Sequence, residues 1–164
     1  MFKNLFKKGN SKTEMVAPVA GELISLEDVP DPVFSQKMMG DGIAIKPSDN
    51  QIVAPVDGEV VQLPETKHAV GLRTEDGIEV LVHIGLETVS LNGEGFTPNV
   101  KTGDQVAKGD PLMTCDFDYI RENASSDITP VVITNGQDTD KTFTMTEESN
   151  GKTGETVIIT ASEK

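Results

Sequence analysis

Short runs in which apolar and polar residues alternate are the main pattern along this chain. The clearest run covers residues 78–84, "IEVLVHI", in which every second side chain is aliphatic. Alternation with a period of two predicts a β-strand with one face against the core and the other face outward. The predicted inner set is Ile78, Val80, Val82 and Ile84, and the predicted outer set is Glu79, Leu81 and His83.

A β-hairpin is predicted immediately before this run. The dipeptide Asp76-Gly77 is typical of a two-residue hairpin turn, and the strand-like stretch "AVGLR" at 69–73 precedes it. A turn of this length pairs residues whose numbers add up to about 153. On that register His83 faces Val70 across the hairpin.

The first two thirds of the chain also contain an internal repeat. The string "VAPVAGEL" at 16–23 recurs as "VAPVDGEV" at 53–60, thirty-seven residues later. A related stretch, "VKTGDQVAKGDPLM", places Gly103 and Gly109 in two turns. Repetition of this kind predicts two copies of one β unit that pack together.

The last third adds further strands and one short helix. The β-branched strings "TPVVITN" and "ETVIITA" predict buried strands, and "DYIRENASS" predicts the helix. The chain has six Phe, one Tyr and no Trp, so aliphatic side chains must fill the core. We therefore expect an all-β protein, an antiparallel β-sandwich or flattened barrel with an internal duplicated β motif and little helix.

Composition and charge narrow the function. With 164 residues and a net charge of −13, the chain fits a single domain that does not bind nucleic acid. No apolar run reaches the length of a membrane span, no secretory signal is visible, and Cys115 is the only cysteine. These features predict a soluble, cytoplasmic protein.

The first residues differ from the rest. Residues 1–12 contain four lysines and no acidic residue, whereas the remaining chain carries −17, from ten basic and 27 acidic side chains. Phe2, Leu5 and Phe6 follow helical spacing. We expect 1–12 to be a flexible, basic amphipathic tail with weak contact to an anionic membrane surface, and 13–164 to be one domain.

His68 and His83 are the only histidines, and the predicted hairpin brings them close together on one sheet. A histidine pair has three interpretations: a structural pair, a metal site, or phosphoryl chemistry. Zinc needs three or four ligands, and no spacing in the sequence recommends Cys115, Asp57 or Glu87 to complete a site. A neutral imidazole is a good nucleophile, and a second imidazole can stabilise the transferred phosphoryl group.

Longer strings resemble the glucose-type enzyme IIA of the bacterial sugar phosphotransferase system. The string "GIEVLVHIGLETVSLNGEGF" is similar to the active-site signature of that family. The strings "DPVFSQKMMGDGIAIKP", "VAPVDGEV", "ETKHA" and "TPVVIT" resemble its other segments, in the same order. The resemblance covers nearly the whole chain and favours the phosphoryl interpretation.

The resemblance implies specific roles. His83 would be the phosphorylated residue, attacking through Nε2, and His68 would assist as a phosphoryl-stabilising donor. Thr66 and the carbonyl of Gly85 would orient the two rings. The implied partners are the histidine-containing phosphocarrier protein, which donates the phosphoryl group, and the IIB domain of a sugar transporter, whose cysteine accepts it. The resemblance implies no cofactor and no metal.

An apolar docking face around the histidines is also implied by the resemblance. Its expected members are Val33, Phe34, Met38, Met39, Val70 and Leu81, with Asp31 and Glu87 at an acidic rim. One of the two methionines is open to interpretation as a core residue. Pro64 and Leu81 occupy positions where similar proteins often carry phenylalanine, so the face is expected to be less aromatic.

A non-enzymatic regulatory or metal-binding β domain is the alternative function. Zinc peptidases of related architecture need an H-x-H pair and an upstream H-x-x-x-D, and the sequence contains neither. A phosphorylation assay distinguishes the two functions. Uptake of phosphate from the phosphocarrier protein supports the phosphocarrier, and no uptake together with stoichiometric zinc supports the alternative.

Overall fold

The computed structural model describes residues 12–163 of the chain. The expected basic tail lies outside the described residues except for Lys12, and its flexibility and membrane contact stay predictions. The strands are β1 (Lys12–Val16), β2 (Gly21–Ser25), β3 (Asp41–Pro47), β4 (Gln51–Val53), β5 (Gly58–Gln62), β6 (Ala69–Arg73), β7 (Glu79–His83), β8 (Phe96–Pro98), β9 (Gln105–Val106), β10 (Pro111–Cys115), β11 (Thr129–Ile133), β12 (Lys141–Met145), β13 (Asn150–Gly151) and β14 (Val157–Glu163). The helices are α2 (Pro32–Ser35) and α3 (Phe117–Asn123), with single 3-10 turns η2 (Leu26–Asp28), η3 (Thr88–Leu91) and η4 (Gly136–Asp138).

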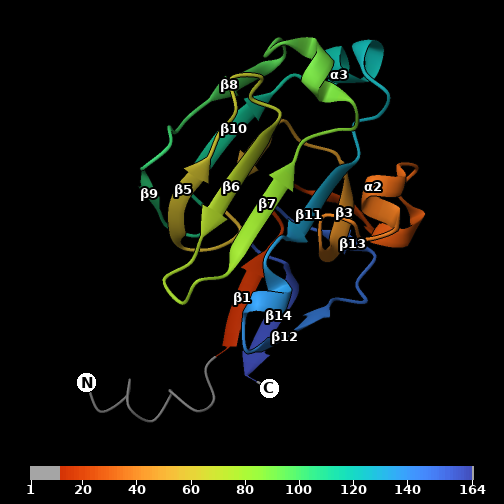
Figure 1. The fold of residues 1–164 in the computed structure, drawn as a ribbon. Coiled ribbons are helices and arrows are strands. Elements are labelled where there is room, and N and C mark those ends of the chain that lie inside the picture. Colours follow the sequence, from red (N-terminus) through yellow and green to blue (C-terminus); the bar gives the residue numbers. More distant parts are fainter. Residues whose placement is uncertain (1–11, 164) are drawn as a thin grey trace.

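These strands form one large and two small sheets. The eight-stranded sheet has the order β13-β2-β3-β11-β7-β6-β5-β9, and the three-stranded sheets are β1-β14-β12 and β4-β10-β8. Neighbouring strands of the described chain pair antiparallel. Figure 1 shows the large sheet above β1, β14 and β12, with α2 beside β3. The predicted all-β, antiparallel class with little helix is confirmed, as are the helix at α3 and the strands at β11 and β14.

The two copies of the repeat pack directly against each other. The backbone N–H of Val16 donates to the carbonyl of Pro55 at 3.0 Å, and the N–H of Val53 donates to the carbonyl of Pro18 at 2.8 Å. These two bonds are equivalent, because each partner is shifted by thirty-seven residues. The prediction of two associated copies is therefore confirmed.

The strands that follow the two copies, β2 and β5, occupy corresponding places in the large sheet. Each is the second strand from an edge of the sheet, and each lies beside the strand that follows it in the chain, β3 or β6. Gly21 of β2 pairs with Gly151, and the equivalent Gly58 of β5 pairs with Val106. The central strands of this order are β11 and β7, where Val131 pairs with Val82.

Both faces of the central strands are buried. The predicted inner set of β7 lies in the main core, as expected, together with aliphatic side chains from the other sheets. A second apolar cluster covers the opposite face of the large sheet; it contains Leu26, Val29, Phe34, Ala44, Ala69, Leu81, Leu86, Ile128 and Val132. The segment from η2 to α2 supplies part of this cover, and this segment is the connection between β2 and β3.

The hairpin between β6 and β7 differs from the prediction by one residue. The N–H of Thr74 donates to the carbonyl of Ile78 at 2.9 Å, which leaves a three-residue turn, 75–77, with Gly77 at a φ of +89°. His83 consequently pairs with Ala69 instead of Val70. Because successive side chains of a strand point to opposite faces, this shift moves Val70 from the expected active face into the main core.

Candidate functional site

His83 ends strand β7 and is held by the turn that follows. Its Nδ1 lies 2.8 Å from the carbonyl oxygen of Gly85. A carbonyl oxygen only accepts, so Nδ1 carries the proton and Nε2 keeps its lone pair. Gly85 has a φ of +77°, and a Cβ built there would lie 2.6 Å from Cγ2 of Thr88 and 2.9 Å from the carbonyl oxygen of Ser126. The turn that fixes the His83 tautomer therefore needs glycine.

His68 lies beside His83, just before strand β6. The two ring centroids are 5.0 Å apart, with 76° between the ring planes. Nδ1 of His68 is 2.6 Å from the hydroxyl oxygen of Thr66. The carbonyl of His68 also accepts from the N–H of Ile84 at 2.7 Å, so backbone pairing fixes the two histidines relative to each other.

Phe34 supports the other side of the His83 ring. Its ring centroid lies 4.9 Å from that of His83, with 60° between the planes. Phe34 is buried in the second apolar cluster and comes from the single turn α2. Asp31 caps this turn, since its carboxylate accepts from the N–H of Val33 at 3.0 Å. The segment that covers the sheet thus also positions an aromatic ring against the imidazole.

Burial keeps both imidazoles neutral. The pKa of His83 is lowered to about 4, first by burial and then by the charge of His68 when that ring is protonated, while the hydrogen bond to the Gly85 carbonyl and the charge of Asp31 oppose the shift. Burial also lowers the pKa of His68. At neutral pH His83 is therefore uncharged, as a nucleophile must be.

The expected docking face is smaller in the structure. Val33 and Met38 are exposed, at 38% and 69%, and Met39 is half-buried against the second cluster. Val70 and Leu81 are corrections: they are 0% and 4% exposed, because the hairpin register turns Val70 inward and the second cluster covers Leu81. Phe34 is likewise buried and meets His83 instead of solvent.

Glu87, one of the two residues expected at an acidic rim, is held by a residue that the sequence did not indicate. Glu87 is exposed and has a φ of +58°. Its carboxylate accepts from the hydroxyl of Ser125 at 2.7 Å. Ser125 lies in the loop between α3 and β11, thirty-eight residues away, and no short-range pattern connects it with Glu87.

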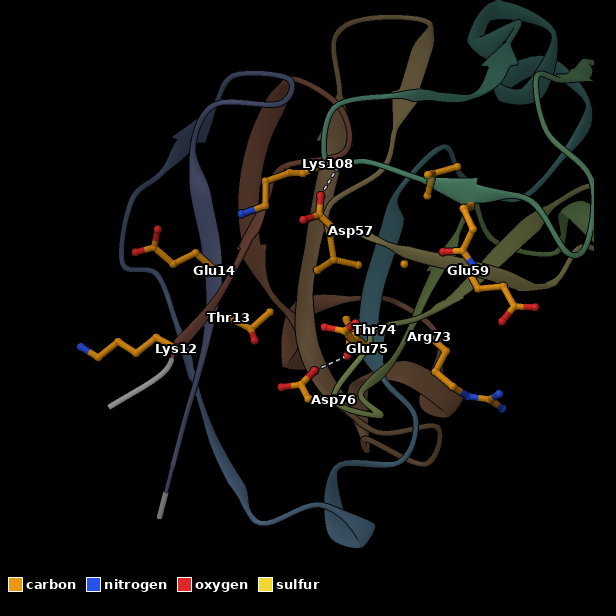
Figure 2. A pocket seen from close by; sticks show the side chains of 14 residues that line it. Lys12, Thr13, Glu14, Asp57, Glu59, Arg73, Thr74, Glu75, Asp76 and Lys108 are labelled. Carbon is orange, nitrogen blue, oxygen red and sulfur yellow. Dashed lines mark hydrogen bonds between the residues drawn. The ribbon is translucent and has the colours of Figure 1, made fainter. Parts of the chain in front are cut away.

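A hollow of about 840 Å³ lies at the turn of the β6–β7 hairpin, the end opposite to the histidines (Figure 2). Its charged lining includes Lys12, Glu14, Asp57, Arg73, Asp76 and Lys108. Neither histidine lines it. The histidine pair thus belongs to a different surface, where Phe34 packs against His83 and the adjacent Val33 is exposed.

The other features considered from the sequence are the single cysteine, a metal site and a membrane span. Cys115 is buried in the main core, and burial raises the pKa of its thiol to about 12. Between residues 12 and 163, no three His, Cys, Asp or Glu side chains are grouped so that they could hold a metal ion. No helix in the described part of the chain has the length and apolarity that a membrane span requires.

Known proteins resemble this chain over nearly its full length. The sequence model for "phosphoenolpyruvate-dependent sugar phosphotransferase system, EIIA 1" matches residues 13–139. The "PTS system glucose-specific EIIA component" of Halalkalibacterium halodurans is 50% identical over 169 aligned positions, which cover 98% of this chain and 97% of that protein. The protein of the same name from Oceanobacillus iheyensis is 51% identical over 138 positions, covering 82% and 84%.

A solved structure agrees with these sequences. The glucose permease IIA from Mycoplasma capricolum superposes with a TM-score of 0.86 at 40% sequence identity, covering 92% of this chain and 96% of that one. Sequence and fold thus lead to one assignment: the chain belongs to the EIIA 1 family of the phosphoenolpyruvate-dependent sugar phosphotransferase system.

Proposed function

We propose that His83 is the residue on which this phosphotransferase component carries its phosphoryl group. Members of the family pass phosphoryl groups from the histidine-containing phosphocarrier protein towards the IIB domain of a sugar transporter. The observation that supports this proposal most directly is the hydrogen bond from Nδ1 of His83 to the Gly85 carbonyl, which leaves the Nε2 lone pair available for attack. The regulatory or metal-binding alternative is not favoured by the family assignment.

Loading is a nucleophilic displacement at phosphorus. Nε2 of His83 forms the new P–N bond while the P–N bond to the donor histidine breaks, and that electron pair returns to the donor ring. The proton on Nδ1 remains there during the transfer, hydrogen-bonded to the Gly85 carbonyl. Positioning and charge stabilisation are the main requirements in phosphoryl transfer, so a rigid imidazole between two packed rings suits the step.

His68 is proposed as the assisting donor. If the hydroxyl of Thr66 donates to Nδ1 of His68, Nε2–H of His68 is free to donate to a phosphoryl oxygen. The cysteine thiolate of the IIB domain then attacks phosphorus, the bond to Nε2 of His83 breaks, and the electron pair returns to the imidazole. A donor that follows the phosphoryl oxygens lowers the barrier for this second transfer.

Partner docking is proposed around Val33 and Met38, with Asp31 and Glu87 facing basic side chains of the partner. The net charge of −13 favours the approach of a basic partner. We further propose a cytoplasmic site of action. Because two similar proteins are named glucose-specific and the similar structure is a glucose permease IIA, we propose glucose as the sugar of the cognate transporter.

Reconstituted phosphorylation tests the proposal. The protein is incubated with phosphoenolpyruvate, enzyme I and the phosphocarrier protein, and the gain of one acid-labile, base-stable phosphate is measured by mass spectrometry. His83→Ala should gain none while its circular dichroism stays that of the wild type. Normal phosphate uptake by His83→Ala overturns the assignment, and no uptake by the wild type together with stoichiometric zinc supports the alternative.

A further inference from the structure

The Gly85–Leu86 peptide group, whose carbonyl accepts the hydrogen bond of His83, is fixed by a second hydrogen bond through its N–H. The N–H of Leu86 donates to the carbonyl of Ser126 at 2.9 Å, while the carbonyl of Gly85 accepts from His83. These two groups belong to one planar trans peptide, in which N–H and C=O point in opposite directions. Fixing the N–H on Ser126 therefore directs the carbonyl at the imidazole.

The preceding peptide is fixed by Thr88. Its hydroxyl donates to the carbonyl oxygen of Ile84 at 2.7 Å, and the Thr88 side chain is fully buried. The N–H of Ile84 donates to the carbonyl of His68, so Ile84 is bound at both ends. Between these two fixed peptides lies only Gly85, which has no side chain to restrict its rotation.

We propose that Thr88 is a positioning residue for phosphoryl transfer, whose hydroxyl holds the Ile84–Gly85 turn so that the Gly85 carbonyl fixes the Nδ1–H form of His83. The inference rests on the proposed role of His83 and adds the residue that prepares it. Thr88 touches neither phosphorus nor the imidazole, and it acts through the backbone.

The hydroxyl group, and not the size of the side chain, carries this role. In Thr88→Val a methyl group replaces the hydroxyl, and the carbonyl of Ile84 loses its partner in a buried position. The turn then rotates to find another donor, and the Gly85 carbonyl moves with it. Thr88→Ser keeps the hydroxyl and should keep the turn.

A matched control lies at the other end of the same hairpin. Thr74 is also buried, and its hydroxyl accepts from the N–H of Ile78 at 2.9 Å. Thr74→Val removes a buried hydroxyl next to β7 without touching the turn at Gly85. A comparable loss of stability is expected there, with no effect on His83.

Two measurements on the full-length protein test the inference: the tautomer of His83 from ¹⁵N chemical shifts of the imidazole, and the rate of phosphoryl uptake from the phosphocarrier protein. For Thr88→Val we expect a mixture of tautomers and uptake slower by about tenfold, as for loss of one buried hydrogen bond. Thr88→Ser and Thr74→Val should keep the single Nδ1–H tautomer and the wild-type rate. If Thr88→Val does not fold, Thr88→Ala replaces it, because it leaves space instead of a new methyl contact.

The inference is overturned if the hydroxyl-free variant keeps the wild-type tautomer, or if its tautomer changes without loss of rate. It is also overturned if Thr74→Val reproduces the full effect, because Thr88 would then contribute stability alone. The tautomer measurement needs no phosphoryl donor. It therefore still decides the role of Thr88 if the wild-type protein takes up no phosphate and the proposed function fails.

Discussion

The rings of His68 and His83 meet edge to face, 5.0 Å apart, but their Nδ1 atoms have different partners. Nδ1 of His83 is hydrogen-bonded to a backbone carbonyl, which can only accept, so the proton is fixed on Nδ1. Nδ1 of His68 is hydrogen-bonded to the hydroxyl of Thr66, which can donate or accept. The nucleophile thus has one protonation pattern, and its neighbour can change its pattern during transfer. This asymmetry leads to different expectations for the two histidines.

Replacing His68 should separate loading from unloading. His68→Gln keeps a side-chain donor but carries no positive charge, so phosphoryl uptake on His83 should continue. Delivery to the transporter cysteine should slow by about 10²-fold, in the range for loss of one oxyanion-stabilising group, because the amide cannot become positively charged as an imidazole can. Both rates are measured on one purified variant. Complete loss of loading, or unloading at the wild-type rate, would contradict the assignment.

The same variant should change the titration of His83. The pKa of His83 is lowered to about 4, with burial as the largest cause and the charge of His68 as the next. Removing the second imidazole removes that repulsion, so the pKa of His83 should rise in His68→Gln. Imidazole shifts followed by NMR from pH 7 downward give both values. An unchanged or lower pKa in the variant would show that the histidines do not interact electrostatically.

Acid should destabilise the protein through His83. The folded pKa of about 4 lies below the ordinary value of 6.5, so the unfolded chain binds more protons between these two pH values. Stability therefore falls as pH drops through this window, by roughly 3 kcal/mol in total. Urea unfolding at several pH values should show a weaker pH dependence for His83→Gln. Equal pH dependence in both proteins would place the sensitivity elsewhere.

Buried and exposed residues near the site should respond differently to truncation. Leu81→Ala removes a core side chain and should lower the free energy of unfolding by about 2–5 kcal/mol. Met38→Ala should change stability by less than about 0.5 kcal/mol, because Met38 is exposed. It should instead weaken binding to the phosphocarrier protein, measured by calorimetry. Val33→Ala serves as a second exposed variant, and unaltered binding in both would argue against this docking face.

Local pattern determined the strands and the repeat. The alternation in 78–84 identified the inner face of β7, and the recurrence of "VAPV" identified the two units that exchange backbone bonds. Both features depend on neighbouring residues, because the period of a strand and the chemistry of a turn are local properties. The all-β class followed from them, and the resemblance in "LVHIG" led to the family.

Register and burial were decided by residues far apart in the chain. The side chain of Asn135 accepts from the N–H of Glu79 and donates to the carbonyl of Gly77, both at 2.8 Å, which supports a three-residue turn where Asp76-Gly77 suggested two residues. This difference of one residue in the length of the turn decided whether Ala69 or Val70 pairs with His83.

The burial of the Leu81 face of β7 by the second apolar cluster also depends on tertiary packing. Alternation predicts which side of a strand Leu81 occupies, but not that the segment carrying Phe34 folds over that side. The same is true of Ser125, which reaches Glu87 only because the loop before β11 lies beside the turn after β7. The sequence by itself determined which residues share a face, since that depends on strand period. Only the tertiary structure decided which face is open to a partner, because that depends on packing between segments distant in sequence.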